Sequence, residues 1–449
     1  MNQELLARID RAIEERRAAL AEDVIRLVNI RSVKGEAQPG APFGPGPRKL
    51  LDTVLEMGQQ KGYHTVDHGV GVVSLAMKPG QPDLGIWLHG DVVHEGTDWK
   101  YAPYQACEYK GCIIGRGATD NKGQLCAIYH LLNIFRELDV PLRYNTALYV
   151  GSDEESGKHD LCGVPGNPDA RGFCNVCTPP RLSLVPDSSF PVGYGGSGAV
   201  FLTLRGKPLQ GLTLTTAQTS DRSRAVAVLD GRVVEVCDPR CNGTALPVDN
   251  MTVTLMERLL EEEQVAAEDR PVLTFFRNIA RDVRGEWLGL NADPGPMKPL
   301  AVRAVQITNE EDCPVLRVVI RYPLAVTLEE ITQKVREKAE AVGLVLTEVD
   351  KRQDAYLLDR DWPVVQKLTE IANDFIGEKK EPYIVGGGTY AHKLPNALAF
   401  GMDGCLPPEG FPAGRGGAHG PDELVSLDRL QRAMKIYARA LLALDEMTW

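Results

Sequence analysis

Short apolar segments alternate with longer amphipathic segments at both ends of this chain, and no other feature constrains its fold as strongly. Strand-like apolar runs occupy residues 70–77, 84–88, 146–150, 182–185 and 397–400. Helical spacing of apolar residues predicts helices over 2–30, 47–62, 122–138, 364–375 and 424–444. Short buried strands that alternate with helices are typical of a mainly parallel sheet covered on both faces. We therefore expect an α/β fold.

The middle of the chain has a different texture. From about residue 195 to 353 the periodic segments are shorter, with strand-like runs at 199–204, 314–322 and 344–349 and helices near 252–264 and 328–342. This mixture indicates an α+β insertion. We expect one domain made of residues 1–193 and 354–449, interrupted by a second domain of residues 194–353.

Charge and composition exclude several classes of function. Lys and Arg number 50 against 61 Asp and Glu, so the net charge of −11 argues against nucleic acid as a partner. No segment approaches the roughly 18 uninterrupted apolar residues of a membrane span. The amino terminus is charged from Glu4 and lacks the apolar core of a signal peptide. Ten cysteines in such a chain predict reduced thiols and a cytoplasmic location, with the pair Cys174 and Cys177 as ordinary thiols rather than a zinc site.

Acidic residues and histidines gather where the predicted strands end. The run 84–88 is followed by His89 and Asp91, the run 146–150 leads into Glu154 and Glu155, and the run 182–185 is followed by Asp187. Because ligand sites in open α/β sheets form at the carboxyl ends of strands, we expect these side chains in one crevice. Imidazole nitrogen and carboxylate oxygen together suit zinc, with manganese or cobalt as alternatives.

Each of these elements has an ordinary explanation when it is taken alone. His89 and Asp91 could be a hydrogen-bonded surface pair, Asp120 could cap the helix that follows it, and Asp187 could be a turn residue. Their joint occurrence at strand ends favours a metal site, because unrelated explanations would otherwise have to coincide.

The order of the motifs resembles a known family. His-x-Asp, Gly-Arg-Gly-x-x-Asp-x-Lys-Gly, Asp-Glu-Glu-Ser-Gly, Pro-Asp and a late His follow one another as in the dinuclear zinc exopeptidases. That family includes dipeptidase V, carnosinase, glutamate carboxypeptidase, succinyl-diaminopimelate desuccinylase and aminoacylase. The resemblance covers about residues 1–193 and 354–449. The segment from Gly386 to Tyr390 is particularly similar to the dipeptidase V branch.

The resemblance implies a ligand set for two zinc ions. Asp120 would bridge the two ions, His89 and Asp187 would complete one position, and Glu155 and His419 would complete the other. The peptide bond after Asp120 would be cis. Before hydroxide is counted, three anionic ligands against two dications would leave the site slightly cationic, which favours a substrate with a carboxylate.

The resemblance also implies catalytic and substrate-binding roles. Glu154 would be the general base, which takes a proton from the bridging water and passes it to the leaving amine. Asp91 would orient the imidazole before it or tune the metal. Arg321, which follows a strand of the insertion, would bind the substrate carboxylate, although an exposed charge at a sheet edge is an equal alternative. Gly388 and Thr389 would line the substrate site.

The chain departs from the family in its insertion, which the resemblance makes a lid. Members carry a lid histidine that stabilises the tetrahedral oxyanion, but the nearest match here, residues 243–247, has Leu246 in that place. We expect Arg321 or His392 to substitute for it; at His392 the dipeptidase V branch often has Arg. The insertion is longer than the lid of dimeric relatives, so we expect a monomer whose lid acts within one chain.

These features predict a metal-dependent, dipeptidase-like amide hydrolase that cleaves a small substrate with a free carboxylate by attack of a metal-bridging hydroxide. An N-acyl or N-carbamoyl amino-acid amidohydrolase is the first alternative. The second alternative is a catalytically impaired member that only binds, although the retained Glu154 argues against it. No nucleic acid or membrane partner is expected.

Overall fold

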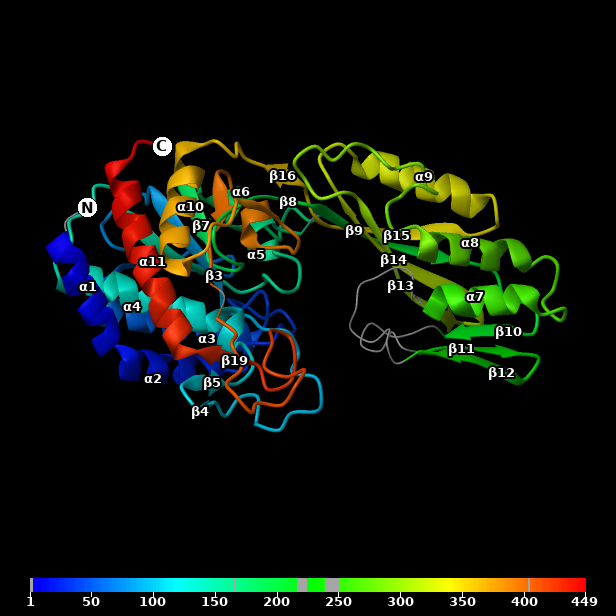
Figure 1. Cartoon of the computed structure of the whole chain (residues 1–449), viewed down its shortest axis with the longest axis horizontal. Coiled ribbons are helices and arrows are strands. Elements are labelled where there is room, and N and C mark those ends of the chain that lie inside the picture. Colours follow the sequence, from blue (N-terminus) through cyan, green and yellow to red (C-terminus); the bar gives the residue numbers. More distant parts are fainter. Residues whose placement is uncertain (1–2, 165, 216–223, 239–250, 403) are drawn as a thin grey trace. The chain divides into compact units, whose positions relative to one another are not determined.

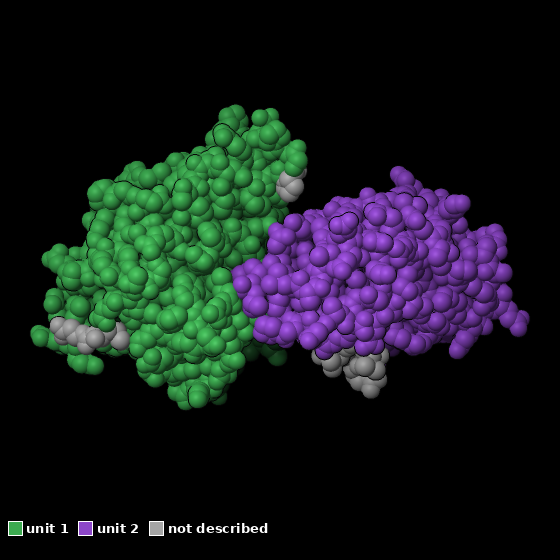
Figure 2. Space-filling model, turned by 90° about the horizontal axis from the view of Figure 1, so that it is seen from above, with its two compact units in different colours: residues 1–195, 358–449 green, residues 196–357 purple. Residues whose placement is uncertain are grey.

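The computed structural model describes residues 3–164, 166–215, 224–238, 251–402 and 404–449. The chain forms two compact units, drawn in different colours in Figure 2. Unit 1 comprises Met1–Gly195 and Leu358–Trp449, and unit 2 comprises Gly196–Leu357. The chain thus leaves unit 1 once and returns to it once.

Unit 1 is built on a large mixed sheet (Figure 1). Its strand order is β1 (His64–Asp67), β2 (Val72–Ala76), β6 (Thr146–Gly151), β3 (Leu84–His89), β7 (Leu182–Val185), β18 (Ala397–Ala399) and β8 (Gly193–Gly196), with β17 (Tyr383–Val385) beside β8. The four central strands, β6, β3, β7 and β18, are parallel to one another. This parallel centre confirms the predicted α/β class.

Antiparallel pairs flank the parallel centre, which the sequence analysis did not anticipate. β1 pairs with β2, β2 with β6, and β18 with β8 in antiparallel directions. The connection between β1 and β2 is too short for a crossover, so those two strands can pair only as a hairpin. The inner strands β2, β3, β6 and β7 are buried along their whole length, which explains why they are continuous apolar runs.

Helices surround the sheet of unit 1. They are α1 (Gln3–Glu15), α2 (Arg17–Val28), α3 (Pro45–Gln60), α4 (Gly123–Glu137), α10 (Pro363–Ile376) and α11 (Leu427–Glu446). α3 contacts β1 and β2, α4 contacts β3 and β6, and α11 contacts α1, α4 and α10 (Figure 1). The single helix predicted over 2–30 is two helices that meet at Arg16. None of the helices in the described ranges is both long and apolar enough to cross a membrane.

Unit 1 also contains short strands and helical turns between its main elements. β4 (Cys107–Tyr109), β5 (Cys112–Ile114) and β19 (Leu424–Ser426) form a small antiparallel sheet. The helical turns are η1 (Ala118–Lys122), α5 (His159–Cys162), α6 (Phe173–Val176) and η4 (Tyr390–His392). The helix predicted over 424–444 starts only at Leu427, because β19 occupies its first residues and Ser426 caps it.

Unit 2 is an α+β unit. The antiparallel order β13 (Ala301–Glu310), β14 (Cys313–Tyr322), β9 (Gly198–Arg205), β15 (Val345–Gln353) forms its larger sheet. A second sheet contains β10 (Leu212–Thr215), β11 (Arg224–Leu229) and β12 (Arg232–Cys237), and the remaining elements are α7 (Met251–Glu261), α8 (Arg270–Arg281), α9 (Leu328–Glu340) and β16 (Tyr356–Leu357). Both sheets and all three helices contribute to one apolar core.

Candidate metal centre

His89 is the last residue of β3, and its ring is fixed on one side by the backbone. Its Nδ1 donates to the carbonyl oxygen of Asp91 at 3.0 Å. In a neutral imidazole the Nε2 lone pair then faces Asp120 Oδ1 at 3.0 Å and Asp187 Oδ2 at 3.8 Å. Three acceptors that face one another in a buried place are suited to a cation between them.

Asp120 lies at the centre of this arrangement, in the turn η1. The peptide bond from Asp120 to Asn121 is cis, as the resemblance implied. One carboxylate oxygen of Asp120 faces His89, and the other lies 3.0 Å from His419 Nε2. Asn121 donates its side-chain amide to Asp187 Oδ1 at 2.7 Å, which directs the second oxygen of Asp187 toward His89.

Glu155 and His419 form the other side of the centre. His419 Nε2 lies 2.9 Å from Glu155 Oε1 as well as near Asp120. The structure thus brings together two clusters of metal-binding donors, His89 with Asp120 and Asp187, and Asp120 with Glu155 and His419. Within each cluster the donor atoms lie within 4.8 Å of one another. Asp120 belongs to both clusters.

The electrostatics of the centre favour bound cations. Burial raises the pKa of Asp187 well above its usual range, and the negative charge of Asp120 adds to the effect. Burial also raises the pKa of Glu155 to about 7. Hydrogen bonds to Asp120 and Glu155 raise the pKa of His419 to about 10. Carboxylates this close repel one another, so a divalent ion between them would favour the ionised forms of Asp187 and Glu155.

Asp91 contacts the ring of His89 and also the backbone of the turn that follows β6. Its two carboxylate oxygens accept the backbone amides of Glu154 and Glu155, each at 3.1 Å. Its Oδ1 also lies 3.6 Å from His89 Nδ1. A single buried carboxylate therefore fixes the end of β3 and the turn that follows β6.

Glu154 is buried beside a lysine that the sequence analysis did not single out. Lys158 Nζ lies 3.0 Å from Glu154 Oε1 and donates to the carbonyl oxygen of Glu154 at 3.1 Å. Burial alone would lower the pKa of Lys158, but the charge of Glu154 raises it above its usual value. The signal available in the sequence was only the spacing of four residues between them.

The glycine-rich turn, from Gly386 to Tyr390, comes near the candidate centre at Tyr390. The Tyr390 ring stands edge-on to the His89 ring at 6.5 Å between centroids, and its hydroxyl donates to Asp160 at 2.5 Å. Thr389 and His392 are both buried beside Tyr390, and Thr389 Oγ1 accepts the amide of Ala391. Gly388 is half-buried in the same turn.

The sequence analysis also singled out Arg321, residues 243–247 and the pair Cys174 and Cys177. Arg321 belongs to unit 2, near the end of β14, where burial lowers its pKa. Residues 243–247, the nearest match to the lid motif, fall outside the described residues. The thiol of Cys177 contacts His68 Nδ1 at 3.4 Å, whereas that of Cys174 points to a backbone carbonyl. Over the described ranges, the two clusters above are the only groups suited to a metal.

A buried ion pair behind the centre was also missed. The carboxylate of Glu423 accepts a hydrogen bond from Arg116 Nη1 at 2.6 Å and from the backbone amides of Gly117, Thr119 and Asp120 at 3.0 Å each. Arg116 is part of the Gly-Arg-Gly motif, but no local pattern connects it with Glu423.

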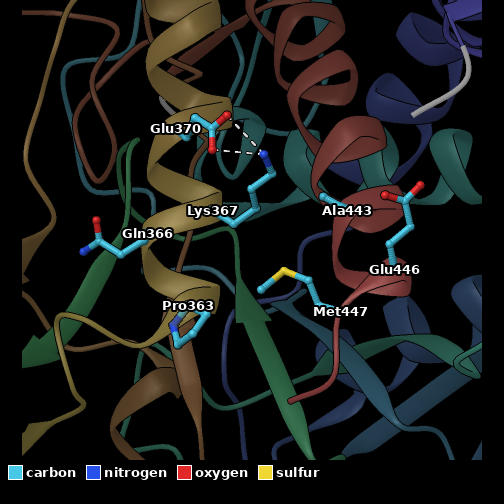
Figure 3. A pocket seen from close by; sticks show the side chains of 7 residues that line it. All are labelled: Pro363, Gln366, Lys367, Glu370, Ala443, Glu446 and Met447. Carbon is cyan, nitrogen blue, oxygen red and sulfur yellow. Dashed lines mark hydrogen bonds and ion pairs between the residues drawn. The ribbon is translucent and has the colours of Figure 1, made fainter.

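A surface hollow of about 750 Å³ between α10 and α11 lies apart from these groups (Figure 3). Its one lysine, Lys367, is bound to Glu370 of the same helix at 3.0 Å. None of the predicted site residues lines it. The hollow is therefore not part of the candidate centre.

Comparison with known proteins gives a consistent result. The model of Peptidase family M20/M25/M40 matches residues 86–443. A protein of Staphylococcus haemolyticus, provisionally named a dipeptidase, is 25% identical, and the match covers 96% of this chain and 98% of that protein. Among solved structures, the dipeptidase Dug1p of Saccharomyces cerevisiae has a TM-score of 0.61 at 13% identity, covering 99% of both chains. Human carnosine dipeptidase 1 has a TM-score of 0.60 at 15% identity, also covering 99% of both chains. These two structures share the fold.

Proposed function

Because this chain belongs to Peptidase family M20/M25/M40, we propose that it is a metal-dependent, dipeptidase-like hydrolase that cleaves the amide bond of a small substrate with a free carboxylate. The observation that carries the proposal is the pair of donor clusters that share Asp120. The dipeptidase name of a relative that matches nearly the whole chain supports the substrate class.

The donor set fits two divalent ions. We assign His89, Asp120 and Asp187 to the first position and Asp120, Glu155 and His419 to the second. Zinc suits this mixture of imidazole and carboxylate, with manganese or cobalt as alternatives. Bound there, the two ions would polarise the scissile carbonyl and lower the pKa of water toward neutrality. Before hydroxide forms, three carboxylates do not cancel two dications, so a small positive excess would attract a substrate carboxylate.

Glu154 is assigned the proton transfer. Its carboxylate is buried at the end of β6, where it would take a proton from the attacking water and deliver it to the leaving amine. Lys158 fixes the carboxylate from one side, and Asp91 fixes the backbone of Glu154 from the other. The base is thus held in one orientation before a substrate binds.

We assign substrate binding to the glycine-rich turn and to unit 2. Gly388 and Thr389 would line the substrate site beside Tyr390. His392 or Arg321 would donate to the oxyanion in place of the lid histidine, and the loss of such a donor typically costs about 2.7–4 kcal/mol. Alanine at both positions tests this assignment: unchanged kcat in both variants would exclude it.

We further propose that unit 2 is a lid that acts on the centre of its own chain, that the protein is a monomer, and that it works in the cytoplasm. The nine cysteines within the described residues are all free thiols, which suits a reducing compartment. For a monomer, light scattering should give the mass of one chain. A stable dimer would contradict the monomer.

A hydrolysis screen tests the function. The protein is depleted of metal, reconstituted with zinc, manganese or cobalt, and assayed in parallel on dipeptides, N-acyl amino acids and N-carbamoyl amino acids. We expect the highest kcat/KM on dipeptides with a free carboxylate, and no turnover after chelation. A preference for acyl or carbamoyl substrates would favour the amidohydrolase alternative, and ligand binding without turnover would favour a binding protein.

A further inference from the structure

Arg116 and Glu423 form an ion pair in the interior of unit 1. Arg116 is 1% exposed and Glu423 is fully buried. Arg116 Nη1 donates to Glu423 Oε2 at 2.6 Å, whereas Arg116 Nη2 donates to backbone carbonyl oxygens outside the pair. Removing a charge pair from water costs free energy, so stability alone does not account for the geometry that this pair enforces.

The Glu423 end of the pair determines the position of the Asp120 backbone. Glu423 Oε1 accepts the amides of Thr119 and Asp120, and Glu423 Oε2 accepts the amide of Gly117. All three bonds are 3.0 Å long. Since the Asp120 side chain faces both donor clusters, the carboxylate of Glu423 sets the place from which Asp120 reaches them.

The Arg116 end holds the loop that carries His419. Arg116 Nη2 donates to the carbonyl oxygens of His419 and Glu95, each at 3.2 Å. His419 needs such a tether because its side chain is 52% exposed and its backbone has a φ of 61°. His89, in contrast, lies on a buried strand with its ring fixed by Asp91.

We infer that the Arg116–Glu423 pair is a positioning device for the second metal position, because it ties the backbone of Asp120 to the backbone of His419. This inference rests on the proposed two-ion centre. Neither residue contacts the reacting atoms; both act through the ligands that they hold. Weakening the pair at its arginine end should therefore affect the position made by Asp120, Glu155 and His419 and spare the other position.

Arg116→Lys separates the two ends of the pair. A lysine keeps a cation beside Glu423, so the buried carboxylate stays compensated. Its single ammonium group lacks the planar fork of arginine and cannot span Glu423 together with the carbonyls of His419 and Glu95. The variant should therefore fold and retain the Asp120 turn, while the His419 loop loses its tether.

The test is a titration of the chelator-treated full-length protein with Co²⁺, followed by calorimetry and by visible absorption. The wild-type protein should bind two ions, and His419→Ala identifies which binding step belongs to the second position. In Arg116→Lys we expect that step to weaken about 10–100-fold, with a changed absorption of the second Co²⁺ and an unchanged first step. Arg439→Lys is the matched control, since Arg439 is held by Asp10 at 2.7 and 2.8 Å and belongs to neither cluster.

The outcomes distinguish failure of this inference from failure of the two-ion proposal. Unchanged affinities in Arg116→Lys, or an equal loss at both positions, would overturn the inference while the two-ion proposal stands. A wild-type protein that binds fewer than two ions would overturn the two-ion proposal itself, and the inference with it. Should Arg116→Lys fail to fold, Arg116→Gln replaces it, because it removes the second arm that holds the His419 carbonyl and leaves the Glu423 carboxylate on its three backbone amides. The same selective loss is then expected.

Discussion

Glu154 and Glu155 are neighbours in sequence, but their carboxylates have different partners. Glu154 Oε1 lies 3.0 Å from the ammonium group of Lys158, and Glu155 Oε1 lies 2.9 Å from His419 Nε2. The first carboxylate is paired with a cation of the protein, whereas the second belongs to a cluster suited to a metal ion. Substitution of the two residues should therefore have different consequences.

Glu154→Gln should lower kcat about 10²–10⁴-fold, because the amide cannot accept the proton. Metal content should stay at the wild-type value. Glu155→Gln should instead weaken metal binding, since it removes an anionic ligand. Turnover and metal analysis of the two purified variants check this prediction, and an exchange of the two phenotypes would contradict the assigned roles.

Asp160 is a buried carboxylate behind the centre. Its Oδ2 accepts the amides of Ser152 and Asp153 and the hydroxyl of Tyr390, while its Oδ1 is buried and has no hydrogen-bond partner among the residues that the structure describes. Burial raises the pKa of Asp160 to about 7, with the nearby charge of Asp91 adding to the effect. The carboxyl is therefore protonated in the folded protein at pH values where it would be ionised in an unfolded chain.

This difference predicts a pH dependence of stability. Between about pH 4 and 7 the folded state retains a proton that the unfolded state has released, so the free energy of unfolding falls as the pH rises. From pH 5 to 7 the contribution is roughly 2–3 kcal/mol. Asp160→Asn should lack it, because asparagine keeps the shape and does not titrate. Urea unfolding of both proteins at the two pH values measures the difference, and parallel pH dependences would contradict the prediction.

At the scale of single elements, the small sheet of unit 1 shows how short strands position the candidate centre. β19 pairs with β5, with Leu424 opposite Ile114. The pairing continues where Gly115 donates its amide to the carbonyl of Glu423 at 2.8 Å. Three paired residues therefore bring the segment after His419 against the segment before Asp120.

Helix α9 of unit 2 offers a test of how an element begins. Thr327 Oγ1 accepts the amide of Glu330, and the Glu330 carboxylate accepts the amide of Thr327. Thr327→Ala should lower the free energy of unfolding of unit 2 by about 1 kcal/mol. Thr332→Ala in the same helix is the control: within the described ranges its hydroxyl bonds only to preceding helix carbonyls, so its loss should change little. Thermal unfolding of both variants checks this, and equal effects would contradict the capping role.

At the scale of the whole molecule, all five proposed metal ligands lie in unit 1. A ligand that binds only the folded state stabilises it, by about 2.7 kcal/mol at a free concentration of 100 Kd. Chelation should therefore lower the unfolding temperature of unit 1 and leave that of unit 2 unchanged. Differential scanning calorimetry with and without chelator measures both transitions. An equal shift of both, or no shift, would contradict the assignment of the ligands to one unit.

The sequence by itself was sufficient for the α/β class and for the placement of His89 and Asp187 at or just after the ends of strands. Fully buried strands must be apolar throughout, so β3, β6 and β7 leave continuous runs that can be recognised in the sequence. The strands β10 to β12 were not anticipated, because short strands with alternating exposure resemble loops in composition.

Only the tertiary structure decided which side chains hold the candidate centre in place. Arg116 and Glu423 are 307 positions apart, and Lys158 reaches Glu154 through a local turn rather than a helix. A periodic pattern records which face of an element is buried, but it does not record which polar group another element brings to that face. Buried polar groups must nevertheless be paired, so the partners of Asp120 depend on how distant segments pack together.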